Sequence, residues 1–282
     1  MIEANDLSDL YRALENFRDS YHFLRTNRSY VGSIKSAFAA IVSLLLNVAD
    51  QQQPPYNLER IGGFLRVHTV EETAMALHGE LIPDNQGFTL RLSRSDAGAS
   101  RRTTFAHELG HTLFYDLRES PPSRASKDPA IDISQDKEEW LCFDFARELL
   151  MPTNAALAAL QANKNSQSLD ALWSFCYRFD VSLTLACRRI FRDLKAWSTS
   201  VVFIAQWNDV SRSWKPIEIF KGKEMKSIRI QTTLLRNILP NSSVIDGKVS
   251  RVVLISGKTF ATEIRSFGPS RLVCMLKKRT TA

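Results

Sequence analysis

The chain has 282 residues, of which 44% are hydrophobic and 24% are charged, and its formal net charge is +7. These values are ordinary for a globular protein, and the length allows two domains. The moderate positive charge favours acidic partners weakly and does not by itself establish nucleic-acid binding. The four cysteines form no Cys-x-x-Cys pair, which excludes a disulfide-dense scaffold and is typical of buried thiols in a reducing compartment.

Residues 1–50 predict a helical N-terminal segment. Apolar residues at three- and four-residue steps mark one face of a helix between residues 7 and 17. Residues 37–49 form the longest apolar run, which is too short to span a bilayer and predicts a buried helix. The N-terminus lacks the basic and apolar stretches of a secretory signal. We therefore expect a soluble, cytoplasmic protein with no membrane partner.

A linker is predicted at residues 51–55, which are polar and end in two prolines. Asn57 can then cap a short helix over residues 58–65. Residues 78–83 and 88–92 alternate between apolar and polar side chains around the sequence Asp-Asn-Gln-Gly. This pattern predicts a β-hairpin, so two strands are expected before the next helix.

The next segment contains the pattern His-Glu-x-x-His, formed by His107, Glu108 and His111, between flanks that are predicted to be helical. Residues four apart lie on one helical face, so both imidazoles can bind the same metal ion. Zinc accepts imidazole nitrogen and keeps one position open for water when the protein supplies three ligands. Glu108 can act as general base toward that water, as in metalloproteases. The competing interpretation is an ordinary amphipathic helix with half-exposed histidines.

Tyr115 stands four residues beyond His111 and is predicted on the same helical face. Its hydroxyl is a candidate to stabilise the oxyanion of the transition state, although a core aromatic is the simpler interpretation. Residues 116–137 are rich in proline, serine and charged residues and predict a loop. That loop is either a mobile rim over the site or a plain connector.

A third metal ligand is expected on the helix predicted at residues 138–151, which ends at Met-Pro. Glu139 aligns with apolar residues at steps of three and four, and a carboxylate on such a face needs a partner such as zinc. Glu138 also has apolar residues at helical spacing, so periodicity does not choose between the two glutamates. Alternatively, Asp136 caps the helix and Glu139 completes a capping box.

The two helices together resemble a known family. The first pattern is Arg-Arg-x-Thr-x-Ala-His-Glu-Leu-Gly-His, which ends at His111, and the second is Glu-x-x-Cys-x-x-Phe-Ala-x-Glu-Leu-Leu-Met-Pro, which begins at Glu139. Over residues 55–195 the chain is similar to the ImmA/IrrE family of bacterial zinc metallopeptidases. That family places a glutamate six residues before Phe-Ala, so the resemblance implies Glu139 as the third ligand.

The resemblance implies an α+β fold in which residues 55–195 form a zincin-like metallopeptidase domain. It implies a zinc-dependent endopeptidase with His107, His111 and Glu139 as ligands and Glu108 as the catalytic base. Family members cleave or remove helix-turn-helix transcriptional repressors and so derepress stress or mobile-element genes, which makes a repressor the expected partner. The chain departs from the family at Phe143, where Asn or Asp is usual, and it has no repressor-type helix-turn-helix at its N-terminus.

The C-terminal domain, residues 196–282, is predicted to be rich in β-structure and matches no motif that would give its role. Short β-type runs occur at four places, residues 201–204, 217–220, 252–255 and 272–276. One or two helices are expected around residues 232–238, and residues 277–279 are interpreted as a solvated basic tail.

Two other functions compete with the peptidase. The first is a DNA-binding regulator that uses residues 172–194 as a helix-turn-helix, with Arg188, Arg189 and Arg192 on phosphates. We favour a solvated helical face for these arginines, because no clear set of base-reading side chains follows Val181 and Ser182. The second is a catalytically inactive peptidase fold that serves as a binding module.

Overall fold

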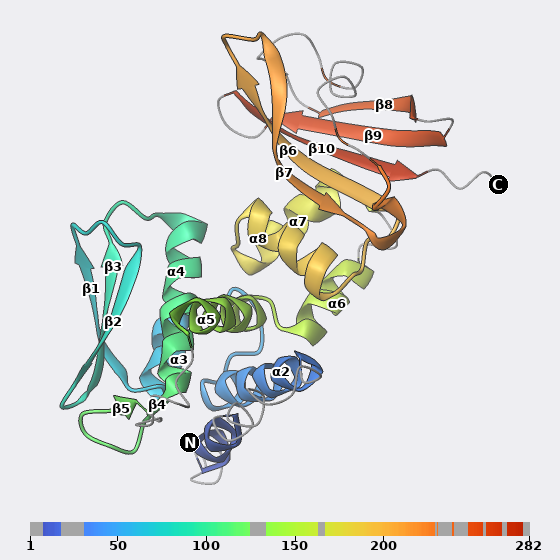
Figure 1. Ribbon diagram of the computed structural model, residues 1–282. Helices are drawn as coiled ribbons and strands as arrows, with labels where there is room; N and C mark the ends of the chain where they lie inside the picture. Colours follow the sequence, from blue (N-terminus) through green and yellow to red (C-terminus); the bar gives the residue numbers. More distant parts are fainter. Residues whose placement is uncertain are drawn as a thin grey trace. The chain divides into compact units, whose positions relative to one another are not determined.

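The computed structural model describes residues 8–17, 31–124, 134–162, 167–228, 230, 239, 248–255, 258–266 and 270–278. Helices and sheets are both abundant, which confirms the predicted α+β class (Figure 1). The chain divides into two compact units. The first comprises Met1–Ala155 and Arg178–Val181, and the second comprises Ala156–Tyr177 and Ser182–Ala282.

The first unit begins with helical residues 8–17 and with α2 (Val31–Val48). The ring of Phe17 lies 5.2 Å from that of Phe38, and Phe38 in turn lies 5.6 Å from Phe145 of the later helix α5. The predicted helices are therefore present where the structure describes this segment. However, α2 buries one face only and exposes the other, although its apolar sequence had predicted burial on nearly all sides.

A three-stranded sheet follows α3 (Leu58–Phe64), whose first turn is capped by Asn57 as predicted. Its strands are β1 (Val67–Thr73), β2 (Gly79–Asp84) and β3 (Gly87–Ser93). Their order is β1-β3-β2, with β1 parallel and β2 antiparallel to β3. The prediction of two strands was therefore wrong by one, because β1 was missed. The strand β2 lies at one edge of this sheet, and its residues Gly79 to Leu81 line the candidate site described below.

The turn of the predicted hairpin is held by Asp84. Its Oδ1 accepts hydrogen bonds from the backbone amides of Gln86 and Gly87, and its Oδ2 accepts one from the hydroxyl of Thr89. The side-chain hydrogen bond with His68 is the main reason why the pKa of Asp84 falls to about 2. Gly87 has φ +147°, in the region that favours glycine. The turn chemistry therefore fixes the register of β2 against β3.

Two helices pack against each other beside the sheet, α4 (Gly98–His111) and α5 (Gln135–Leu150). Between them lie the 3-10 turn η1 (Thr112–Phe114), β4 (Tyr115–Asp116) and β5 (Ser123–Arg124). The helix α5 ends at Leu150 with Met151 as its C-cap, one residue short of the predicted end, and it begins before residue 138. The capping box proposed for Asp136 was wrong, because Ser134 holds the N-cap position and Asp136 lies within the first turn.

The second unit contains most of α6 (Thr153–Ala162) and of α7 (Leu169–Phe179), together with α8 (Leu183–Arg188) and the π-helical turn η2 (Arg189–Asp193). These precede a five-stranded antiparallel sheet of order β7-β6-β10-β9-β8. Its elements are β6 (Ser200–Asn208), β7 (Ser213–Lys221), the 3-10 turn η3 (Lys223–Met225), β8 (Lys248–Ile255), β9 (Lys258–Ser266) and β10 (Arg271–Lys278).

The C-terminal sheet confirms the predicted β-rich region and adds strands to it. All four predicted runs lie in strands, while β9 was missed. Lys277 and Lys278 belong to β10 rather than to a tail. The helices expected around residues 232–238, and Arg279, lie outside the described residues. A buried cluster that includes Phe203, Phe260 and Cys274 forms the core of this unit.

The contacts of α7 and α8 explain why the division between units falls near Ala155 and not at residue 195. The carboxylate of Glu263 accepts a hydrogen bond of 2.7 Å from the Leu169 amide at the start of α7. The hydroxyl of Thr184 in α8 donates one of 2.5 Å to Glu218 of β7. The predicted domain limits stay a prediction. No helix among the described residues is long and apolar enough to cross a membrane.

Candidate metal centre

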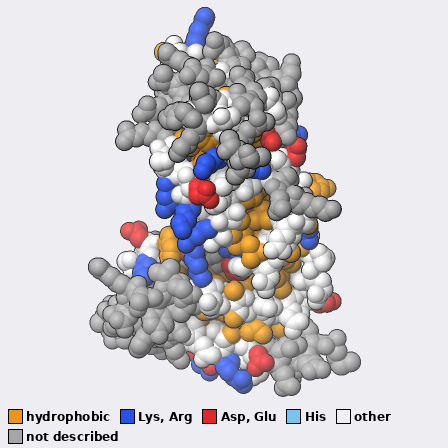
Figure 2. Space-filling model, turned by 90° about the vertical axis from the view of Figure 1, so that its right-hand side faces the viewer, with side chains coloured by type: hydrophobic (Ala, Val, Ile, Leu, Met, Phe, Trp, Pro, Cys, Tyr) orange, Lys and Arg blue, Asp and Glu red, His pale blue; other side chains and the backbone are white. Residues whose placement is uncertain are grey.

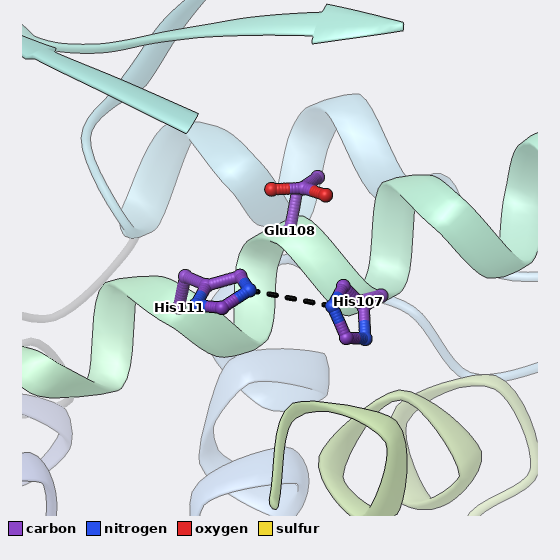
Figure 3. A group of neighbouring side chains, drawn as sticks. All are labelled: His107, Glu108 and His111. Atoms are coloured by element: carbon purple, nitrogen blue, oxygen red, sulfur yellow. Dashed lines mark hydrogen bonds between the residues drawn. The ribbon is translucent and has the colours of Figure 1, made fainter. Parts of the chain in front are cut away.

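The helix α4 brings His107, Glu108 and His111 together (Figure 3). The two histidines face each other along the helix, with their Nε2 atoms 3.3 Å apart. One potential ligand atom from each of the three residues lies within 4.8 Å of the others. The helical spacing in the sequence therefore produces the predicted pair of converging imidazoles.

Glu139 reaches this pair from α5. Its Oε2 lies 2.9 Å from Nε2 of His107, and its Oε1 lies 3.5 Å from Nε2 of His111. The Nε2 atoms of both imidazoles and the carboxylate of Glu139 therefore lie within 3.5 Å of one another. This is a donor set that zinc accepts while it keeps a fourth position open. The residues present fit the metal that the sequence predicts.

Glu138 contacts the opposite side of His111. Its Oε1 lies 2.8 Å from Nδ1 of His111, and its Oε2 accepts a hydrogen bond of 2.5 Å from Arg124. Burial would raise the pKa of Glu138, but these two partners lower it overall. Burial likewise disfavours the charged form of His111, but the hydrogen bond to Glu138 and the nearby carboxylate charges together outweigh it, so the pKa of His111 is raised. With Nδ1–H donated to Glu138, the Nε2 of a neutral His111 presents its lone pair toward Glu139 and His107.

Glu108 is 6% exposed, and burial is the main reason why its pKa rises to about 7. Its position depends on Gly79, at the start of β2. A Cβ at Gly79 would lie 2.7 Å from Cγ2 of Thr104 and 2.8 Å from Oε1 of Glu108, closer than side chains pack. The glycine therefore lets the strand edge approach the motif helix.

A cavity of about 830 Å³ opens over these residues, between β2, α4 and the start of α5. Phe143 lines it, with its ring centroid 4.1 Å from that of His107. The Nδ1 of His107 is buried and has no hydrogen-bond partner among the residues that the structure describes. His107 is 7% exposed, whereas the amphipathic-helix interpretation predicts a half-exposed side chain. The apolar ring of Phe143 thus stands beside the metal site, where the family usually has Asn or Asp.

Tyr115 also lines the cavity, but not from the predicted position. The helix α4 ends at His111, so Tyr115 lies in β4 and not on the same helical face. Its ring packs edge-on against Phe88 at 5.1 Å, and the guanidinium of Arg124 lies 5.3 Å from its centroid. A role for its hydroxyl in catalysis stays a prediction.

Sequence reasoning missed three contributors to the site. Glu138 was considered only as an alternative ligand, whereas it contacts the outer nitrogen of His111. Arg124 lies in a segment with no periodic pattern, so nothing in the sequence marked it. Gly79 was treated as part of a strand, although an isolated glycine in a strand often marks a close backbone approach.

Comparison with known protein families finds a match that contains the residues of this candidate site. The family model described as Peptidase M78, IrrE N-terminal-like domain, matches residues 65–191. These residues belong to the ImmA/IrrE family. The family region includes the whole cluster on α4 and α5 and extends through α8. The predicted resemblance is therefore confirmed.

A solved structure shares the fold of this protein over most of the chain. It is a Mycobacterium tuberculosis transcriptional regulator, with a TM-score of 0.52 and 12% sequence identity. The similarity covers 94% of this chain and 81% of that chain. At this low identity it indicates a common fold and no more. No curated protein matches the chain.

Of the three arginines in the helix-turn-helix interpretation, Arg192 is exposed and Arg189 is buried. Lysine and arginine side chains gather on part of the face drawn in Figure 2. However, Arg189 is only 4% exposed and pairs with Asp193 at 3.6 Å. Arg188 pairs with Glu218, also at 3.6 Å. The expectation that Arg189 lies on a solvated face was therefore wrong, and a buried arginine is also unable to reach a phosphate.

Proposed function

We propose that this protein is a zinc-dependent endopeptidase that cleaves a regulatory protein. The observation that carries the proposal is the convergence of His107, His111 and Glu139 beside a buried carboxylate, Glu108. The match of residues 65–191 to the Peptidase M78 family model supports this proposal. No other described group of three or more His, Cys, Asp or Glu side chains lies close enough together to hold a metal ion.

In this mechanism His107, His111 and Glu139 hold the ion. Zinc, when bound, supplies a Lewis acid that polarises the scissile carbonyl and lowers the pKa of water. Glu108 takes the proton from the attacking water and passes it to the leaving amine.

The substrate would bind in extended form along β2. This strand is at the edge of its sheet, and its residues Gly79 to Leu81 line the cavity next to Glu108. An extended peptide can add to such an edge through backbone hydrogen bonds. We propose a helix-turn-helix transcriptional repressor as the substrate, whose removal would derepress stress or mobile-element genes. The membership in the ImmA/IrrE family supports this choice.

Metal content and peptide cleavage together test the proposal. We expect about one zinc per wild-type chain and a sharp loss in Glu139→Ala. Glu108→Gln should keep its zinc but lose cleavage of a proteome-derived peptide library analysed by mass spectrometry. Asp136→Asn is the matched control, because it removes an exposed carboxylate from the first turn of α5.

The outcomes separate the competing functions. A wild-type protein that takes up no zinc after loading would rule out the peptidase. Zinc binding without cleavage of the library or of any tested repressor would favour an inactive binding module. A Glu108→Gln protein that cleaves at the wild-type rate would remove Glu108 from its role. DNA binding that weakens with salt and survives metal removal would instead support the regulator.

A further inference from the structure

The Nδ1 atom of His111 contacts a buried carboxylate, whereas the Nδ1 atom of His107 contacts none among the described residues. Glu138 is 4% exposed, and its Oε1 lies 2.8 Å from Nδ1 of His111. By contrast, Nδ1 of His107 is buried without a partner among the described residues, beside the ring of Phe143. The two imidazoles of the site are therefore held by different means, one by a hydrogen bond and one by packing.

The second oxygen of Glu138 is also occupied. It accepts a hydrogen bond of 2.5 Å from Arg124, which comes from β5 and not from either motif helix. The guanidinium of Arg124 lies 5.3 Å from the ring of Tyr115 on the paired strand β4. One chain of contacts thus runs from the β4–β5 hairpin through Arg124 and Glu138 to His111. A carboxylate with both oxygens engaged keeps a defined orientation.

We infer that Glu138 is a positioning residue for the metal centre, and that Arg124 holds it in place. The inference rests on the proposed zinc site. A carboxylate that accepts Nδ1–H fixes the tautomer of a histidine ligand, turns Nε2 toward the metal and increases the basicity of that nitrogen. Glu138 does this for His111, while the neighbouring Glu139 contributes its carboxylate to the ion itself. The two adjacent glutamates of α5 therefore have different roles.

Zinc affinity measured by competition with a chelating indicator tests the inference without any substrate. Loss of such an outer partner typically weakens metal binding about 10–100-fold, and we expect this range for Glu138→Gln and Glu138→Leu. Glutamine keeps an acceptor without the charge, so its effect should be the smaller of the two. Arg124→Met, which keeps an apolar side chain beside Tyr115, should show a smaller loss again. Asp136→Asn should bind zinc like the wild type.

A spectroscopic readout separates positioning from a general effect on folding. Cobalt substituted for zinc absorbs visible light according to its ligand geometry. We expect the bands of Glu138→Leu to shift and those of Asp136→Asn to stay unchanged, with circular dichroism confirming that both proteins are folded. If Glu138→Leu does not fold, the isosteric Glu138→Gln decides the question by the same two measurements.

Four results would overturn all or part of the inference. Wild-type zinc affinity and unchanged cobalt bands in the Glu138 variants would remove the positioning role and leave the proposed function intact. A loss of zinc as complete as that of Glu139→Ala would make Glu138 a ligand instead. A wild-type chain that binds no zinc would overturn both proposals together. Wild-type affinity in Arg124→Met would remove Arg124 from the contact chain.

Discussion

Gly110 lies between the two motif histidines, at the point where α4 and α5 are closest, and its replacement by alanine is a sharp test of the site. A Cβ there would lie 2.9 Å from Cα and 3.1 Å from Cβ of Cys142. Because the nearest atom belongs to backbone, α5 itself must move. Gly to Ala in a helix interior normally gains about 1 kcal/mol, whereas overpacking costs about 1–3 kcal/mol. We expect Gly110→Ala to lower the free energy of unfolding by up to about 2 kcal/mol, which is the overpacking cost less the gain in helix propensity.

The same movement carries Glu139 away from the imidazoles, so zinc should bind more weakly to Gly110→Ala. Gly63→Ala in α3 is the matched control, because a Cβ there meets nothing within 4 Å. We expect it to gain up to about 1 kcal/mol and to bind zinc normally. Urea unfolding and chelator competition measure both quantities. A Gly110→Ala protein that is as stable as the wild type and binds zinc equally well would refute the reasoning.

Three more predictions concern pH, thiols and metal. Hydrogen bonding from His68 lowers the pKa of Asp84 to about 2 from an ordinary 3.8, so the stability it contributes is present above the ordinary value and is lost as pH falls toward 2. The difference in unfolding free energy between wild type and Asp84→Asn should therefore close in acid; a constant difference would contradict this. Burial raises the thiol pKa of Cys142, Cys176 and Cys187, so iodoacetamide at about pH 8 should label them only after unfolding, as counted by mass spectrometry. Free zinc at about 100 times its Kd should raise the free energy of unfolding by about 2.7 kcal/mol, and this gain should be absent with EDTA or in Glu139→Ala.

Much of the fold could be predicted because strong local signals agree with the tertiary structure. Asn57 caps α3, and the Asp-Asn-Gln-Gly turn closes the β2–β3 hairpin. Met-Pro ends α5, since the residue before proline disfavours helix. Each of these signals is made by side chains a few residues apart. They do not depend on what the rest of the chain packs against.

The missed strands have weak patterns for physical reasons. The strand β1 lies at one edge of its sheet, and polar residues occupy both of its faces, so its sequence lacks regular alternation. In β9 the buried face consists of Phe260, Thr262 and Ile264. A buried threonine interrupts the apolar period there, and the strand is not apparent from hydrophobicity alone.

The end of α4 is a similar case. No glycine or proline follows directly after His111, so no local signal predicts that the helix stops before Tyr115. The chain nevertheless tightens into a 3-10 turn and enters β4. The hydrogen-bonded pairing of β4 with β5 decides this, and it joins residues seven and nine positions apart in the sequence. Tyr115 reaches the cavity from a strand, a route that helical periodicity does not predict.

The choice between Glu138 and Glu139 shows most clearly where periodicity fails. Consecutive residues on a helix point about 100° apart, so one would expect only one of two adjacent glutamates to face a given site. Both reach this one because the imidazole of His111 offers two nitrogens on different edges of its ring. Glu138 bonds Nδ1 from a buried position, and Glu139 lies against Nε2 on the cavity side. The imidazole ring of His111 lies between the two glutamates. Glu138 is therefore a hydrogen-bond partner of the histidine, and Glu139 is a candidate metal ligand. Both glutamates therefore contact His111, Glu138 from a buried position and Glu139 from a partly exposed one, and the role of Glu139 as a metal ligand stays a prediction.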